Sequence, residues 1–198
     1  MVTLNSGKTE NSGKTDMEAL IKAVKAAGDG ALPVDKWHPE FCGAMDMIIR
    51  RDGTWQHEGT IITRKSLIKL FSKVLRRDDD GETYLVTPVE KIKIKVDVAP
   101  FLAVRVDIKN KGKSQRLFFT TNVGDVVELG PDHKLGVLTD SITGAPIPLV
   151  HIRGNLQALL SRPVFYELVE AAIESDDRLG VYSAGLFFPL GEKRAHNV

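Results

Sequence analysis

Apolar and polar positions alternate most regularly in residues 45–97, and the pattern predicts a strand, a turn, a strand, a helix and a returning strand. Alternating apolar runs flank Asp52-Gly53, a dipeptide typical of a two-residue β-hairpin turn. A second turn is predicted at Asp80-Gly81. Between the two turns, apolar residues recur at helical spacing, at Leu67, Leu70, Phe71, Val74 and Leu75. Beyond the second turn they alternate with lysines, at Ile92, Ile94 and Val96.

The rest of the chain is mostly β in pattern. Short apolar or alternating runs predict strands over 102–108, 116–121, 125–129, 135–139, 147–152 and 181–190. A helical region is predicted over 155–174, interrupted at Pro163 because proline removes a helix hydrogen bond. The fold class is therefore α+β. Residues 1–15 are expected to form a flexible tail, 16–97 an N-terminal helix, linker and first α+β unit, and 98–198 a second, strand-rich α+β unit.

The two halves carry similar segments, which predicts a duplicated core. At an offset of 89 residues, Arg64 aligns with Arg153 and Ser66 with Asn155, each just before a predicted helix. Serine and asparagine are preferred N-cap residues, so both are expected to cap these helices. Past the helices the offset becomes 98 residues. The second copy would then contain nine extra residues, which we place within its helical region.

Composition and charge narrow the classes of function. The formal net charge is +1, with 27% charged residues, which argues against a protein that binds nucleic acid through bulk charge. No apolar run approaches the length of a transmembrane helix, and the first residues lack the apolar core of a signal peptide, so no membrane association is expected. Cys42 is the only cysteine, which fits a reducing cytoplasm, where we expect the protein to reside.

Motifs for a nucleophile, a metal or a cofactor fail on spacing or context. The two NSGKT pentapeptides lack the spacing and the preceding strand of a phosphate-binding loop. Ser66 and Lys69 match a serine acyl-enzyme pattern without its partner motifs. His38, Cys42 and His57 lack the spacing of zinc ligands. The sequence therefore predicts no cofactor, no metal site and no motif-defined catalytic residue.

Trp55 and His57 are the most suggestive pair for a binding site. They lie two residues apart on a predicted strand and so share one face. A two-residue turn would put Trp55 opposite Arg50 and His57 opposite Ile48. An aromatic ring, an imidazole and a guanidinium on one face suit a cleft that stacks a flat ligand and binds an anion. The alternative is that Trp55 packs under the second unit beside a satisfied histidine.

Four segments carry a family resemblance: LPVDKWHPEFCGAMDM, RDGTWQHEGTIITR, LFSKVLRRDDDGETYLVTPVEKI and PLVHIRGNLQALLSRPVFYELVE. They resemble an uncharacterised bacterial family, domain of unknown function 1285, over about residues 32 to 191. The resemblance implies a duplicated α+β core whose second half is loosely pleckstrin-homology-like. It also implies a ligand site where the halves meet, a nucleotide-like or nucleic-acid-derived ligand, and a role in signal transduction. It supplies no established catalytic residues.

The favoured hypothesis is a cytoplasmic, non-enzymatic binding or sensor module whose ligand lies between the two units. Arg64 and Arg153 stand at matching positions before the predicted helices, where arginines can meet helix N-terminal amides around an anion. We therefore expect a nucleotide-like anionic ligand. The residues predicted to bind it are Arg50, Trp55, His57, Arg64, Glu90 and Arg153.

Two other classes of function stay open. One is an enzyme that acts on a phosphate-containing small molecule, with His57 as general acid or base beside Glu58 or Glu90. The other is a protein–protein adaptor that uses the lysine-rich strand over residues 91–96. The enzyme requires a carboxylate or second acid–base group within reach of His57. The adaptor requires an exposed apolar patch or an open sheet edge, and the sequence identifies no protein partner.

Overall fold

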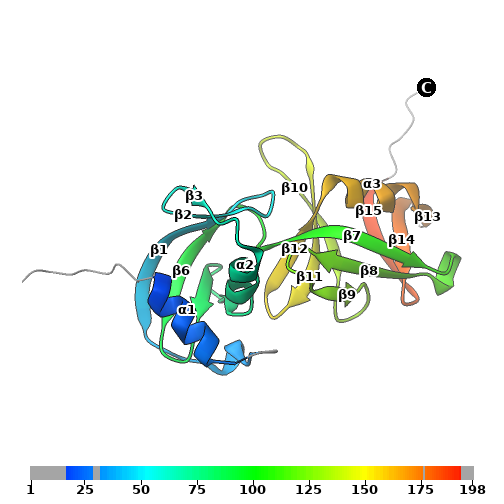
Figure 1. The fold of residues 1–198 in the computed structure, drawn as a ribbon. Coiled ribbons are helices and arrows are strands. Elements are labelled where there is room, and N and C mark those ends of the chain that lie inside the picture. Colours follow the sequence, from blue (N-terminus) through cyan, green and yellow to red (C-terminus); the bar gives the residue numbers. More distant parts are fainter. Residues whose placement is uncertain (1–16, 29–31, 176, 193–198) are drawn as a thin grey trace, which may run out of the picture.

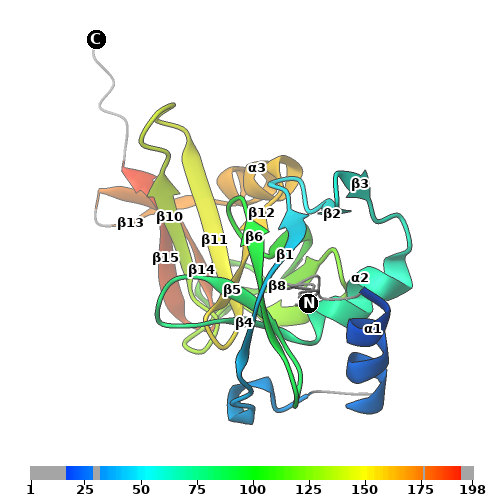
Figure 2. The same ribbon diagram turned by 90° about the vertical axis from the view of Figure 1, so that its left-hand side faces the viewer.

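The computed structural model describes residues 17–28, 32–175 and 177–192, which form two sheet-rich units packed side by side (Figures 1 and 2). The helices of the first unit are α1 (Met17–Ala26), the short 3-10 helix η1 (Val34–Lys36) and α2 (Lys65–Ser72). Its strands are β1 (Phe41–Ile49), β2 (Trp55–His57), β3 (Thr60–Ile61), β4 (Leu75–Arg77), β5 (Thr83–Val86) and β6 (Lys91–Val96). They form one sheet in the order β3-β2-β1-β6-β5-β4, in which β1 and β6 pair in parallel.

Helices α1 and α2 lie together on one face of this sheet, as the apolar stripes of their sequences require (Figure 1). Leu20 and Val24 are the buried residues of α1, and Phe71 of α2 is fully buried. Helix α2 is shorter than predicted, because Leu75 already begins strand β4. Val74 and Leu75 are nevertheless buried in the core. Their spacing therefore continued the apolar stripe of α2, and the helix predicted from this periodicity was too long.

The second unit begins with strand β7 (Phe101–Lys109) and the 3-10 helix η2 (Gly112–Ser114). It continues with β8 (Arg116–Thr121), β9 (Val126–Glu128), β10 (Leu135–Thr139), β11 (Pro146–Arg153), β12 (Leu156–Leu160), α3 (Arg162–Glu170), β13 (Ile173–Ser175), β14 (Arg178–Ser183) and β15 (Leu186–Glu192). Strands β10-β11-β12-β7-β8-β9 form a curled sheet resembling a half-barrel, and β13-β14-β15 form a separate meander. The fold is therefore α+β, as the sequence predicts.

One apolar core connects the two units. It includes Phe71 and Leu75 of the first unit together with Val123 and Leu156 of the second. Burying apolar area across the junction stabilises the docked arrangement, since that area is removed from water on both sides. The junction between the two units is therefore a packed interface. Any pocket at its surface is lined by residues from both units.

The β1–β2 hairpin corrects the predicted register. Its turn holds three residues, 51–53, because the Arg50 amide bonds the Thr54 carbonyl and Gly53 adopts a left-handed φ of +81°. Trp55 therefore lies opposite Ile49 rather than Arg50, and His57 opposite Met47 rather than Ile48. A shift of one residue moves every side chain of a strand to the other face. The predicted face shared by Trp55 and Arg50 is wrong, because Trp55 lies on the buried face of Met47 and Ile49.

The helical region predicted over 155–174 is three elements: strand β12, helix α3 and strand β13. β12 lies between β11 and β7, and its apolar residues are buried on both faces, so it gives the same continuous apolar pattern as a buried helix. Pro163 does not kink a helix. It lies in the first turn of α3, where its missing N–H has no helical partner to lose.

The duplication is visible in the order of elements, because β1-β2-β3-α2-β4-β5-β6 and β10-β11-β12-α3-β13-β14-β15 follow the same sequence. Tyr84 in β5 and Tyr182 in β14 occupy the middle strands of the two meanders, at the predicted offset of 98. The same offset aligns the helices, α2 with residues 163–170 of α3. The alignment at 89 is wrong, since it matched helix α2 with strand β12 and Arg64 with the end of β11.

Candidate functional site

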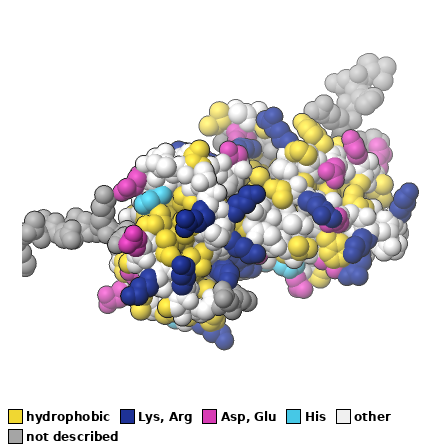
Figure 3. Space-filling model, viewed as in Figure 1, with side chains coloured by type: hydrophobic (Ala, Val, Ile, Leu, Met, Phe, Trp, Pro, Cys, Tyr) yellow, Lys and Arg dark blue, Asp and Glu magenta, His cyan; other side chains and the backbone are white. Residues whose placement is uncertain are grey.

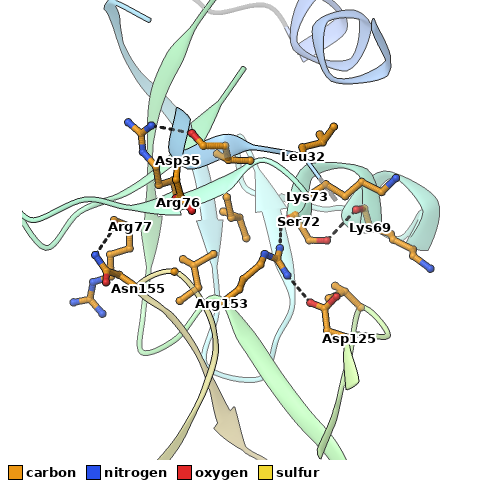
Figure 4. Close-up of a pocket in the computed structure, with 15 residues that line it drawn as sticks. Leu32, Asp35, Lys69, Ser72, Lys73, Arg76, Arg77, Asp125, Arg153 and Asn155 are labelled. Atoms are coloured by element: carbon orange, nitrogen blue, oxygen red, sulfur yellow. Dashed lines mark hydrogen bonds and ion pairs between the residues drawn. The ribbon is translucent and has the colours of Figure 1, made fainter. Parts of the chain in front are cut away.

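A pocket of about 380 Å³ opens at the junction of the two units (Figure 4). The first unit contributes the segment around η1, the C-terminal part of α2, and β4. The second contributes the turn before β9 and the turn between β11 and β12. The lining residues are Leu32, Val34, Asp35, Lys69, Ser72, Lys73, Leu75, Arg76, Arg77, Val123, Asp125, Arg153, Gly154, Asn155 and Leu156.

Arg153 fixes the wall between the units. Its guanidinium donates to Asp125 Oδ2 at 2.7 Å within the second unit and to the Ser72 carbonyl at 2.5 Å in the first. The same group lies 4.9 Å from the centre of the Phe101 ring, a cation–π distance. Asn155 adds a second bond across the junction, from its side-chain amide to the Arg77 carbonyl at 3.2 Å. The pocket is therefore held in shape by the protein itself.

Arg76 holds the opposite wall. It forms a forked contact with Asp78, with nitrogen–oxygen distances of 2.6 and 3.2 Å, and donates to the carbonyls of Val34 and Trp37 at 3.1 and 2.7 Å. Lys91 Nζ also bonds Asp78, at 2.5 Å. Burial raises the pKa of the Asp78 carboxyl, but the hydrogen bonds from Arg76 and Lys91 outweigh it and leave that pKa below its ordinary value. The segment around η1 is thus tied to β4.

The pocket carries an excess of positive charge. Its described lining contains five basic side chains and two acidic ones. Arg153 forms an ion pair with Asp125, and Arg76 forms one with Asp78. Lys69 lies on α2, Lys73 is the C-cap residue of that helix four positions further on, and the Nε of Arg77 donates to the Gly81 carbonyl. Figure 3 shows Lys and Arg side chains over α1, α2 and the junction. The cavity therefore favours an anion.

Comparison with known proteins decides the family. A model described as "Domain of unknown function (DUF1285), N-terminal domain" matches residues 32–99, and one described as "Protein of unknown function (DUF1285), C-terminal domain" matches residues 100–190. The chain belongs to the DUF1285 family. No curated protein matches it.

Two solved structures of DUF1285 proteins show the same fold. The protein from Silicibacter pomeroyi DSS-3 is 44% identical, with a TM-score of 0.82, and the match covers 87% of this chain and 94% of that one. The protein from Shewanella baltica OS155 is 27% identical, with a TM-score of 0.50, and the match covers 64% of this chain and 92% of that one. The expected DUF1285 resemblance is confirmed, and the two family models divide the chain at the junction where the pocket lies.

Of the six residues predicted to bind a ligand, Arg153 lines the pocket and the other five do not. Trp55 is fully buried and stacks on Phe71, with ring centres 6.4 Å apart. His57 is half-buried, and its Nδ1 lies 3.0 Å from the Asp46 carbonyl oxygen. A carbonyl cannot take up a proton at neutral pH, so this contact does not supply the carboxylate that an acid–base role for His57 requires.

The remaining three predicted residues lie apart from one another. Arg50 is exposed at the β1–β2 turn, where its Nε donates to Gln56 at 3.0 Å. Arg64 is the exposed N-cap residue of α2, so Ser66 is not the cap, and Asn155 lies in the β11–β12 turn. Glu90 lies in the turn before β6, with one carboxylate oxygen buried and unbonded among the described residues.

The lysine-rich strand predicted for an adaptor is not a sheet edge. β6 lies between β1 and β5. Lys91 pairs with Asp78 and Lys93 with Glu82, at 2.5 and 2.8 Å, and Lys95 is exposed. In the part of the chain that the structure describes, no cluster of three His, Cys, Asp or Glu side chains could hold a metal ion. Across 17–28, 32–175 and 177–192, no helix is long and apolar enough to span a membrane.

Sequence reasoning missed Lys69, Lys73 and Arg77. The lysines carry a weak signal, because residues four apart on a helix share its surface and this pair lies off the apolar stripe. No feature of the sequence indicates that these residues and the β11–β12 turn line the same pocket, because the turn lies more than 75 positions away along the chain.

Proposed function

We propose that this DUF1285 protein is a binding module that takes a small anionic ligand in the pocket between its two units. The observation that supports the proposal most strongly is that basic side chains from both units line one cavity. Lys69, Lys73 and Arg77 approach from the first unit and Arg153 from the second. A preformed cavity with few, fixed polar groups is the usual form of a small-molecule site.

The lining also suggests the shape of the ligand. Apolar side chains make up one part of it, at Leu32, Val34, Leu75, Val123 and Leu156. None of the described lining residues is aromatic, so a ring would rest on aliphatic side chains rather than stack on Trp55. The volume of about 380 Å³ lies in the lower part of the range of ligand pockets. The proposed ligand is therefore a compact phosphate or carboxylate metabolite, with mononucleotides at the upper limit of size.

The position of the pocket supports a role as a sensor. A ligand that contacts α2 and the β11–β12 turn together binds only when the two units are docked. Such a ligand stabilises the docked form in proportion to its concentration over its dissociation constant. Ligand level would then set how firmly the two DUF1285 units associate, which is a means of passing a signal to a partner.

The first test is a thermal-shift screen with inorganic phosphate, citrate, and the adenosine and guanosine monophosphates, at low salt. Hits are then titrated by calorimetry against wild type and against Lys69→Gln and Arg77→Gln. Each substitution removes one hydrogen bond to an anion and should weaken binding about tenfold, which corresponds to about 1.4 kcal/mol. The loss should shrink at high salt, since both groups are open to solvent.

The matched control is Arg64→Gln, because Arg64 is exposed on the same helix but lies outside the pocket. It should bind the hits as wild type does. If no anion in the screen raises the midpoint of unfolding, or if Lys69→Gln and Arg77→Gln bind the hits no more weakly than Arg64→Gln, the proposed site is wrong.

A further inference from the structure

A second and larger cavity, of about 940 Å³, shares no residue with the basic pocket. Residues of helix α3, the β10–β11 loop and the β1–β2 turn contribute to its lining. The lining residues are Arg51, Asp52, Leu102, Asp140, Thr143, Ala145, Pro146, Pro148, Leu159, Leu160, Ser161, Arg162, Phe165 and Tyr166.

The walls of this cavity are mainly apolar. Leu102 of β7 and Leu159 of β12 are adjacent in the parallel pairing and belong to a small apolar cluster separate from the main core. Helix α3 adds Phe165 and Tyr166, and the Tyr166 side chain is 61% exposed. Tyr166 and the two leucines therefore form an apolar surface in an open cavity, which suits an apolar ligand.

The charged groups of the cavity are unequally matched. Asp140 accepts hydrogen bonds from the amides of Ile142 and Thr143, at 3.0 and 2.9 Å, and lies 3.8 Å from the Arg51 guanidinium. Asp52 accepts from the Thr54 amide at 2.9 Å. Both carboxylates are thus committed within the protein.

Arg162 is the exception. It is exposed, and its side chain makes no hydrogen bond or ion pair to any residue that the structure describes. Arg162 is therefore the one charged side chain of the lining without a partner among the described residues, and its planar guanidinium fits a carboxylate. The two aspartates in the same cavity disfavour a dianion such as phosphate, because like charges repel at short range.

We infer that this cavity is a second ligand site, which takes an apolar monocarboxylate such as a medium-chain fatty acid. The carboxylate binds Arg162, and the chain lies along Leu102, Leu159 and Tyr166. This chemistry differs from that of the basic pocket, where several cations and a small volume select a compact anion. The two sites are therefore tested independently of each other.

The test uses decanoate, decanol and acetate as probes with the full chain, below the concentration at which decanoate forms micelles. Binding is followed by methyl NMR, in which the signals of Leu102 and Leu159 report on the cavity. Decanoate should shift these signals saturably, decanol should bind at least tenfold more weakly, and acetate should leave them unmoved. Arg162→Gln should weaken decanoate about tenfold and make it resemble decanol.

Three variants separate the contributions. Arg162→Lys keeps the charge and should recover part of the affinity, and Tyr166→Ala should weaken decanoate without changing its preference over decanol. Arg64→Gln, which lies outside both cavities, should bind as wild type does. The inference is overturned if decanoate does not bind saturably, if decanol binds as tightly, or if Arg162→Gln leaves the affinity unchanged.

Discussion

Replacing Trp55 by alanine should destabilise the protein strongly, because Trp55 is a core residue of the first unit. Its side chain is fully buried and stacks on Phe71 of α2. Large-to-small substitution of a buried aromatic removes its transfer free energy and leaves a cavity, which together cost about 3–5 kcal/mol. That is a large part of the about 5–15 kcal/mol by which a typical domain is stable.

A second substitution at the same position separates packing from polar effects. The indole Nε1–H of Trp55 is buried without a hydrogen-bond partner in the described residues. Trp55→Phe removes that N–H, whose burial costs about 1–3 kcal/mol, while it also loses some apolar contact. These effects oppose each other, so the free energy of unfolding of Trp55→Phe should fall by far less than that of Trp55→Ala.

The assay is urea unfolding followed by far-ultraviolet circular dichroism, which does not depend on tryptophan fluorescence. Tyr166→Ala is the control, since Tyr166 is a mostly exposed aromatic and surface substitutions usually change stability by about 0.5 kcal/mol or less. If Trp55→Ala unfolds within about 1 kcal/mol of wild type, as Tyr166→Ala should, Trp55 is not in the core and the observed hairpin register is wrong.

Three further predictions concern stability. Gly53→Ala should cost at least about 1 kcal/mol in urea unfolding, because a Cβ at this left-handed residue would lie 3.2 Å from Leu102 Cβ. Asp78→Asn should lower the free energy of unfolding at neutral pH but change it little in acid. The pKa of Asp78 in the folded protein lies below its ordinary value of 3.8, so the carboxylate stabilises the fold above pH 3.8 and loses this contribution as the pH falls through the lower, folded-state pKa. The hydrogen bond to Asp80 raises the pKa of Tyr84 to about 12, so the neutral phenol stabilises the fold fully below pH 10.0 and loses this contribution as the pH rises through about 12. In Tyr84→Phe, the free energy of unfolding should therefore depend less on pH over this range.

The fold could be predicted where the apolar pattern had one interpretation. The stripe of α1 and the alternation of β6 specify both their structure and their buried face. The segment 156–160 could not be assigned in this way, because a strand buried on both faces has no alternation, and its leucines also fit a helical spacing. This error also affected the alignment of the two repeats. Because the helix was assigned to the segment of strand β12, the offset between the helices was set at 89 residues instead of 98.

The hairpin at residues 50–54 shows how one turn decides a site. Asp52-Gly53 is compatible with a two-residue turn and with the three-residue turn that the structure has, in which glycine takes the left-handed position. The choice inverts the faces of β2, so the sequence argument assigned the buried Trp55 to a cleft. Local sequence does not distinguish the turns. The core does, because Trp55 loses water contact only in the observed register.

The candidate pocket lies between the two units, where the family resemblance implies a ligand site, but most of its lining residues could not be predicted from the sequence. The family resemblance placed a site between the halves, and Arg153 lies there. Lys69, Lys73 and Arg77 join it only through the docking of the two units, which depends on long-range packing that no short motif records. Arg64 and Arg153 were paired by a false alignment, so the presence of Arg153 in the pocket does not confirm the argument that selected it.

The most direct test of the central claim is a crystal structure of the protein with the anion that binds it most tightly. We expect the anionic group to lie within hydrogen-bond distance of Lys69 or Arg77, and ligand atoms to contact Arg153 or Asn155 of the second unit. A ligand that contacts one unit alone, or that occupies another surface while the pocket between the units stays empty, would contradict it.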